Sequence, residues 1–259
     1  MHFQNTLLCL RAGKPVVCEK PFALNARQAA VAIALAREKK LFLMEAVWTR
    51  FFPAMEKVRE WLAAGLIGEV RLLEADFGIV VPWHAEGRHF SLAEGGGALL
   101  DVGIYCVSLS SLLFGSPTCI ASDAMLGSTG VDEQCGMVLR HAGGQMSSLL
   151  ASFRADTHKG ATIYGGAGRI EIHATFWKPS HLSLVTASEQ TQEIALPYPN
   201  FGYQFEAAHV MDCLRRGQLE QPDVTGRNAV RAADAGRDPR AVEPRLFWGR
   251  SGIWRRVSR

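Results

Sequence analysis

Several common signals are missing from this sequence. No two cysteines form a CxxC pair and no histidines stand at metal-ligand spacing, so we expect no metal site. The start, residues 1–5, lacks the basic and apolar regions of a signal peptide. We also expect no run long and apolar enough to cross a bilayer, hence no membrane partner and a cytoplasmic location. Six scattered cysteines favour free, mostly buried thiols of a reducing compartment: Cys9, Cys18, Cys106, Cys119, Cys135 and Cys213.

Positive and negative charges nearly balance over most of the chain. The net charge of all 259 residues is +3, and residues 223–259 hold nine arginines against four acidic residues. That segment contributes +5 and leaves −2 for the other 222 residues. The main part of the chain therefore gives no reason to expect nucleic acid as a partner. An association of the Arg-rich segment with nucleic acid stays open as a minor alternative, and it would weaken steeply with salt.

Helical and strand patterns alternate over the first 47 residues. Residues 3–12 favour a helix that ends at Gly13, and residues 14–19 form a short β-branched run. A capping box at residues 25–28 opens a predicted helix to about residue 40, and residues 41–45 form a second apolar strand. This order predicts the parallel sheet of an α/β fold, so residues 1–47 are expected to be one unit.

The pattern changes after residue 47. An amphipathic helix over 54–64 and a strand over 70–81 precede a series of short strands, and a last helix is expected over 202–216. Short turns between these strands favour a mainly antiparallel sheet in an α/β domain over residues 48–222. The series comprises 121–125, 134–139, 145–153, 162–164, 169–173, 182–185 and 192–196. Residues 223–259 keep no amphipathic period and favour a frame-shifted end or a disordered extension.

A glycine triplet, Gly95 to Gly97, leads into an apolar segment that we expect to be helical over residues 98–114. In a helix Asp101 and Tyr105, four residues apart, share one face. A carboxylate and a phenol are then presented together from a largely buried helix. The alternative is a core helix that Asp101 caps and in which Tyr105 only packs.

Glu19, Lys20 and Pro21 directly follow the first predicted strand. The carboxyl ends of parallel strands face the ligand crevice of open α/β sheets. A lysine there is well placed for anions, substrate oxygens or proton transfer, and Pro21 biases Lys20 toward an extended conformation. Taken alone, the tripeptide is equally compatible with a solvated turn.

Four segments stand out together: AGKPVVCEKP (12–21), EAVWTRFFP (45–53), GEV (68–70) and GGGALLDVGIY (95–105). In their order and spacing, over about residues 2–222, they resemble the glucose–fructose oxidoreductase/inositol dehydrogenase family of NAD(P)-dependent oxidoreductases. Tyr105 together with residues 45–53 looks most like the branch of dimeric trans-dihydrodiol and NADP-dependent xylose dehydrogenases.

The resemblance implies a Rossmann domain that binds NADP or NAD, with NADP favoured, and a substrate domain that often forms a homodimer. It implies hydride transfer between the nicotinamide and a diol or sugar hydroxyl. Tyr105 would be the acid–base group, Lys20 would bind the substrate oxygen and lower the pKa of Tyr105, and Asp101 would orient the substrate or this pair. The implied cofactor contacts are Glu19, Lys20, Pro21, Trp48 and Arg50. Trp83, His84, Arg88, Asp101 and, less strongly, His89 are the expected substrate contacts.

One family feature is missing. The Gly-x-Gly-x-x-Gly turn of a Rossmann domain is not found, since Gly13 is the only glycine before residue 65. Against the family pattern we expect roughly 70–90 N-terminal residues, the mononucleotide-binding half, to be absent, so that residues 1–47 are a remnant of the Rossmann sheet. The chain is then an oxidoreductase with its chemical residues retained, although it could be inactive as it stands. The main alternative is a catalytically dead dimerisation or binding module.

Overall fold

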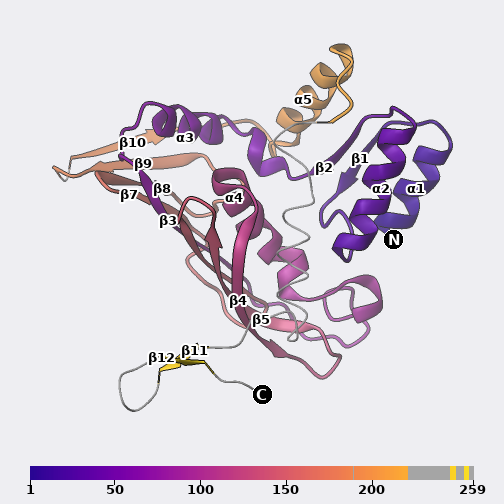
Figure 1. The fold of residues 1–259 in the computed structure, drawn as a ribbon, viewed down its shortest axis with the longest axis horizontal. Helices are drawn as coiled ribbons and strands as arrows, with labels where there is room; N and C mark the ends of the chain where they lie inside the picture. Colours follow the sequence, from indigo (N-terminus) through magenta and orange to yellow (C-terminus); the bar gives the residue numbers. More distant parts are fainter. Residues whose placement is uncertain (189, 221–245, 249–253, 257–259) are drawn as a thin grey trace.

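A small parallel sheet begins the computed structural model, which describes residues 1–188, 190–220, 246–248 and 254–256. Strands β1 (Val16–Glu19) and β2 (Leu43–Ala46) pair in parallel, and helices α1 (His2–Arg11) and α2 (Ala26–Glu38) pack beside them (Figure 1). The alternating pattern of the first 47 residues is confirmed. The side chain of Asn25 accepts from the Gln28 amide at 2.9 Å and so caps α2, as the capping box predicts.

The larger sheet has eight strands in the order β10-β9-β8-β7-β3-β6-β5-β4, and only β3 and β6 run parallel. The prediction of a mainly antiparallel sheet is therefore confirmed. Its strands are β3 (Val70–Gly78), β4 (Pro117–Leu126), β5 (Asp132–His141), β6 (Met146–Ser152), β7 (Ala161–Gly165), β8 (Gly168–Ile172), β9 (His181–Thr186) and β10 (Thr191–Ala195).

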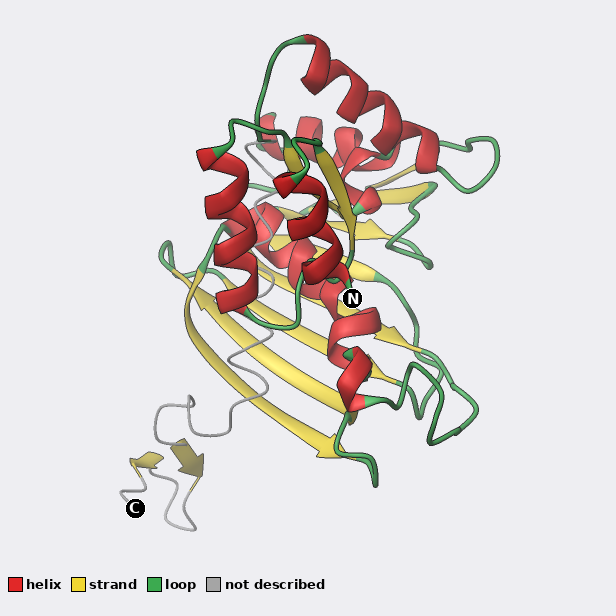
Figure 2. Cartoon of the chain, turned by 90° about the vertical axis from the view of Figure 1, so that its right-hand side faces the viewer, coloured by secondary structure: helices red, strands yellow, loops and turns green. Residues whose placement is uncertain are grey.

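Helices cover one face of this sheet (Figure 2). Alternation along β5 and β6 turns Leu139 and Leu149 into the core, whereas Val138 and Leu150 stay more than 40% exposed on the opposite face. The helices on the core side are α3 (Pro53–Ala63) and α4 (Ile104–Phe114), with the short turn η2 (Leu92–Glu94) before α4.

The segment after the glycine triplet differs from the regular helix predicted over 98–114. Residues Leu99–Gly103 (η3) form a π-helical turn and α4 follows it. Asp101 does not cap the start, because Asp132 of β5 accepts from the Leu99 amide at 2.6 Å. Asp101 lies within this wider turn and Tyr105 lies at the start of α4. π-helical turns are frequent at functional sites.

Residues Leu92–Phe114 are long and apolar enough to cross a membrane by length and composition. The expectation that no apolar run reaches that length is therefore wrong. Most of this stretch is buried, and η3 and α4 contact strands β3 and β6 of the large sheet. Its apolar character is explained by burial in the core of the protein.

The two sheets meet at the turn η1 (Trp48–Phe51) and at the last described helix, α5 (Tyr203–Arg215). Helix α5 packs on β2 and η1 through a cluster that includes Phe51 and Cys213. The chain then returns to the small sheet, where the Leu43 amide donates to Leu219 O at 3.1 Å. The boundaries expected at residues 47 and 222 stay predictions.

The predicted irregular tail, residues 223–259, falls largely outside the described residues. Within it only the strands β11 (Leu246–Trp248) and β12 (Trp254–Arg256) are described, and they pair with each other. All six cysteines lie in the described part, all are free, and four of them are buried.

Candidate functional site

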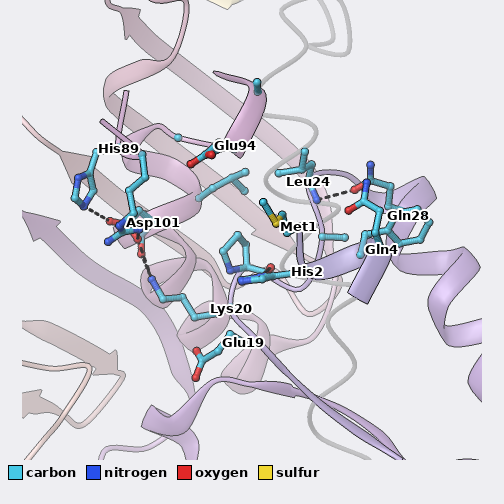
Figure 3. Close-up of a pocket in the computed structure, with 18 residues that line it drawn as sticks. Met1, His2, Gln4, Glu19, Lys20, Leu24, Gln28, His89, Glu94 and Asp101 are labelled. Carbon is cyan, nitrogen blue, oxygen red and sulfur yellow. Dashed lines mark hydrogen bonds and ion pairs between the residues drawn. The ribbon is translucent and has the colours of Figure 1, made fainter. Parts of the chain in front are cut away.

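Lys20 and Asp101 meet although 81 residues separate them in the sequence. Lys20 follows the carboxyl end of β1, and its Nζ donates to Asp101 Oδ1 at 3.2 Å and to Asp101 O at 2.5 Å. Both side chains are 17% exposed, so the ion pair is largely removed from water. Figure 3 shows Lys20 extending to Asp101 across the wall of a cavity.

Two further basic side chains approach the same carboxylate. Arg88 Nη1 lies 3.4 Å from Asp101 Oδ1 and His89 Nε2 lies 3.6 Å from Asp101 Oδ2. Burial alone would raise the pKa of Asp101, but Lys20 and Arg88 outweigh it and hold the pKa below its usual range. Burial and the neighbouring Arg88 lower the pKa of His89. Asp101 is thus an ionised carboxylate that holds three side chains around one point.

Tyr105 lies next to this group, with Lys20 Nζ 5.0 Å from the centre of its ring. Its hydroxyl accepts a hydrogen bond of 3.2 Å from Trp48 Nε1. Burial raises the pKa of Tyr105 far above the ordinary value of a phenol, and the Trp48 bond offsets this only in part. The pKa of Tyr105 is thus raised and not lowered, because burial dominates. A lowering effect of Lys20 on this pKa stays a prediction.

Aromatic rings surround the hydroxyl of Tyr105. Trp48 stacks on Tyr203 of α5 with ring centres 4.3 Å apart, and Phe77 of β3 stacks on Trp177 at 3.5 Å. The ring of Tyr105 lies 5.7 Å from that of Phe77 and 6.3 Å from that of Trp177. We call Trp48, Phe77, Trp177 and Tyr203 the aromatic wall. Its last three members were not predicted from the sequence, because they look like ordinary core or surface residues until the fold brings them together.

A cavity of about 430 Å³ opens between the small sheet and the glycine-rich segment (Figure 3). Predicted site residues that line it are Glu19, Lys20, Pro21, Arg88, His89 and Asp101. Other lining residues were not predicted from the sequence, among them His2, Gln4, Gln28 and Glu94. His2 Nδ1 lies 2.8 Å from Pro21 O, so α1 is tied to the turn that carries Lys20.

The other predicted contacts lie elsewhere. Trp48 belongs to the aromatic wall and does not line the cavity, whereas Trp83 and His84 are exposed in the loop before η2. Arg50 is buried and its guanidinium group donates to Ser108 of α4, at 2.9 Å from Nη2 to Oγ. Through this hydrogen bond the side chain of Arg50 connects η1 to α4.

The cavity offers a donor and acceptor set that fits the nicotinamide–ribose half of a dinucleotide. Lys20, Gln4 and Gln28 supply donors, and Glu19 supplies an acceptor for ribose hydroxyls at the carboxyl end of β1. A pyrophosphate is usually bound at a glycine-rich turn between a strand and a helix. The β1–α2 connection, residues 20–25, contains no glycine and so is not such a turn. In the described part of the chain no group of three His, Cys, Asp or Glu residues is arranged to hold a metal ion.

Comparison with known proteins gives matches along most of the chain. Residues 1–47 match the model of an oxidoreductase family with an NAD-binding Rossmann fold, and residues 55–174 match the GFO/IDH/MocA C-terminal domain. The chain is 40% identical over 233 residues to a trans-1,2-dihydrobenzene-1,2-diol dehydrogenase of Homo sapiens, covering 85% of this chain and 68% of that protein. The corresponding enzyme of Xenopus tropicalis is 37% identical over 232 residues, with coverages of 86% and 69%.

Solved structures give the same picture of the fold. An aldose–aldose oxidoreductase from Caulobacter crescentus, complexed with glycerol, superposes with a TM-score of 0.83 at 21% identity, covering 99% of this chain and 76% of that one. A 3-ketoreductase from Actinomadura kijaniata, in complex with NADP and TDP-benzene, gives a TM-score of 0.78 at 25% identity, with coverages of 91% and 74%.

Proposed function

Because the chain belongs to the GFO/IDH/MocA family of NAD-binding oxidoreductases, we propose that it transfers hydride between a nicotinamide cofactor and a hydroxyl-bearing carbon of a diol or sugar. The observation that carries the proposal is the group formed by Lys20, Asp101 and Tyr105. Lys20 and Asp101 line a polar cavity, and Tyr105 lies behind them, with its ring centre 5.0 Å from Lys20 Nζ. These groups suffice to bind the oxygen of a substrate and to move one proton.

In this mechanism Tyr105 holds the proton. The phenol is protonated at neutral pH, and its raised pKa extends the protonated form further into the alkaline range. The phenol is therefore a donor for the oxygen of a carbonyl substrate, and in the opposite direction it must first lose its proton. Lys20 orients the same oxygen, and Asp101 holds Lys20 in place. When bound, the nicotinamide ring supplies the hydride acceptor or donor. Glu19, Lys20 and Pro21 would hold its ribose.

The proposed substrate is a small ring that carries neighbouring hydroxyls. Within the aromatic wall Trp48 and Phe77 are buried, whereas Tyr203 is exposed and Trp177 is half-buried. The accessible parts of such flat rings fit the apolar side of a sugar or a cyclohexadiene diol. The names of the human and frog relatives support a dihydrodiol, and the name of the Caulobacter crescentus enzyme supports an aldose. We propose NADP as the preferred cofactor, since the Actinomadura kijaniata enzyme is complexed with it.

A homodimer in the cytoplasm completes the proposal. The uncovered face of the large sheet exposes Val138, Met146 and Leu150 on adjacent strands, and a second copy of the chain would bury them. Sedimentation analysis of wild type and Leu150→Glu tests this, and a monomeric wild-type protein would contradict it.

Replacing Tyr105 tests the proposed chemistry directly. Turnover is measured with NADP or NAD on trans-1,2-dihydrobenzene-1,2-diol and D-xylose, alongside a titration of NADPH followed by tryptophan fluorescence. We expect Tyr105→Phe to lower turnover by about 10²-fold or more with little change in cofactor affinity. Tyr164→Phe is the matched control, because this tyrosine lies on β7 and its hydroxyl contacts Glu74.

Near-normal turnover of Tyr105→Phe would refute the role of this residue. A folded wild-type chain that binds no dinucleotide would instead favour the alternative of a catalytically dead binding module. For an active enzyme, the burial of Tyr105 further predicts that oxidation of the alcohol speeds up toward alkaline pH, while reduction of the carbonyl does not.

A further inference from the structure

Glu206 is a buried acidic residue that the mechanism above does not use. It lies in the first turn of α5 and is only 8% exposed, and among the described residues its Oε2 has no hydrogen-bond partner. No basic side chain pairs with it in the part of the chain that the structure describes. A buried carboxyl group without a partner is costly to ionise.

The titratable groups on the surrounding elements do not neutralise it. Those on the neighbouring strands and on η1 are Glu19, Glu45 and Arg50, and α5 itself carries Tyr203, His209, Asp212, Cys213 and Arg215. Glu19 adds a like charge. Arg50 points its guanidinium group to Ser108, and Glu45 accepts from the Phe22 amide at 3.0 Å. His209 contacts Phe51 and Cys213.

Burial, reinforced by Glu19, raises the pKa of Glu206 to about 7. Below that pH the side chain is a neutral acid and its burial is tolerated. Above that pH Glu206 is a buried carboxylate that the negative charge of Glu19 repels. Exposure of the first turn of α5 to water most directly removes the cost of burying the ionised Glu206.

The first turn of α5 also supports the aromatic wall. Tyr203 precedes Glu206 by three residues and so lies on a neighbouring part of the helix surface. Its ring stacks on that of Trp48 at 4.3 Å with an angle of 18° between the planes. Trp48 Nε1 in turn donates to the hydroxyl of Tyr105 at 3.2 Å. A shift of this turn therefore reaches the phenol through a chain of two contacts.

We propose that Glu206 is a positioning residue for Tyr105. In its protonated form it keeps the first turn of α5 packed on η1, and its ionisation releases Tyr203 and loosens the hydrogen bond from Trp48 to Tyr105. The proposal rests on the proposed function only in taking Tyr105 as the acid–base group. The packing link itself requires neither cofactor nor substrate.

Nuclear magnetic resonance of the tryptophan indole groups tests this link on the full chain. The indole N–H signal of Trp48, identified by its loss in Trp48→Phe, is followed from about pH 5 to about pH 9, on either side of the pKa of about 7. We expect a wild-type shift with its midpoint near 7 and no such shift in Glu206→Gln. Glu193→Gln is the matched control on the exposed strand β10 and keeps the wild-type titration.

Thermal stability gives a second readout. The folded state holds a proton on Glu206 that the unfolded state releases above its ordinary pKa of 4.5, so wild-type stability falls as pH rises from 4.5 to about 7. In Glu206→Gln this part of the decline disappears, and in Glu193→Gln it stays.

A wild-type Trp48 signal that does not change with pH overturns the proposal, as does a titration that persists in Glu206→Gln. If Glu206→Gln does not fold, Glu19→Gln is the deciding variant. Removal of the neighbouring charge must lower the midpoint pH of the Trp48 titration, and an unchanged midpoint overturns the proposal. None of these measurements uses turnover, so a failure of the proposed oxidoreductase function would show separately as an inactive protein with an intact titration.

Discussion

Replacing Asp101 with asparagine removes one charge from the centre of the site and keeps the shape of the side chain. The gross attraction between Lys20 Nζ and Asp101 Oδ1 at 3.2 Å is about 5 kcal/mol at an effective dielectric constant of about 20. Removing both groups from water offsets most of it. Asparagine still accepts a hydrogen bond, and Lys20 keeps its bond to Asp101 O.

We therefore expect Asp101→Asn to lower the free energy of unfolding by about 1–2 kcal/mol at neutral pH. For a chain of this size that corresponds to a fall in melting temperature of roughly 2–8 °C. The pKa of Asp101 is depressed in the folded state, so its contribution is present above the ordinary value of 3.8 and is lost as pH falls through the folded value. The difference between wild type and variant should shrink in acid.

The same substitution should change the electrostatics of Tyr105. Asp101 is one of the charges that raise the pKa of this phenol, and without it the positive charge of Lys20 is no longer balanced by this carboxylate. We expect the phenol to ionise at lower pH, measured as the alkaline change in ultraviolet absorbance that Tyr105→Phe abolishes. Asp123→Asn, on the exposed side of β4, is the control for melting temperature and absorbance. Equal stability of wild type and Asp101→Asn, together with unchanged ionisation of Tyr105, would refute the reasoning.

Two further predictions concern stability. Burial lowers the pKa of His141, so the stability of the wild type should be fully present above the ordinary value of 6.5 and fall as pH drops below it. Denaturant titrations of His141→Gln at several pH values should not show this fall in stability. A fall that persists in the variant would contradict the role of His141. Gly95 has a positive φ of 78° and a side chain there would meet Leu24, whereas Gly13 has a similar φ of 74° in open space. Gly95→Ala should therefore cost about 1–3 kcal/mol more than Gly13→Ala, and equal losses would show that the contact with Leu24 yields freely.

Local sequence signals predicted the elements of the fold well. The capping box at Asn25 and the change from helical to alternating patterns depend on neighbouring residues, and the structure has both features where they were expected. The motifs around Lys20, Asp101 and Tyr105 also pointed to the family. The π-helical turn was not foreseen, because it depends on how Asp132 of β5 meets the Leu99 amide.

The site itself shows where sequence reasoning ends. Arg50 looked like a cofactor contact, yet it lies buried on Ser108, and Trp83 lies exposed in a loop. Trp177 and Tyr203, by contrast, carried no local signal and belong to the aromatic wall. Only the folding of distant segments onto one another decides which aromatic and charged residues face the same point.

The sequence alone determined the types of secondary structure, the family and the identity of the chemical groups, because hydrophobic periodicity, capping residues and short motifs act over a few residues. The tertiary structure alone decided the ionisation of those groups. Burial extends the protonated form of the Tyr105 phenol further into the alkaline range, and the ammonium group of Lys20 is paired with Asp101. Glu206 becomes titratable near neutral pH. Each depends on desolvation and on charges from distant elements, which no stretch of sequence contains.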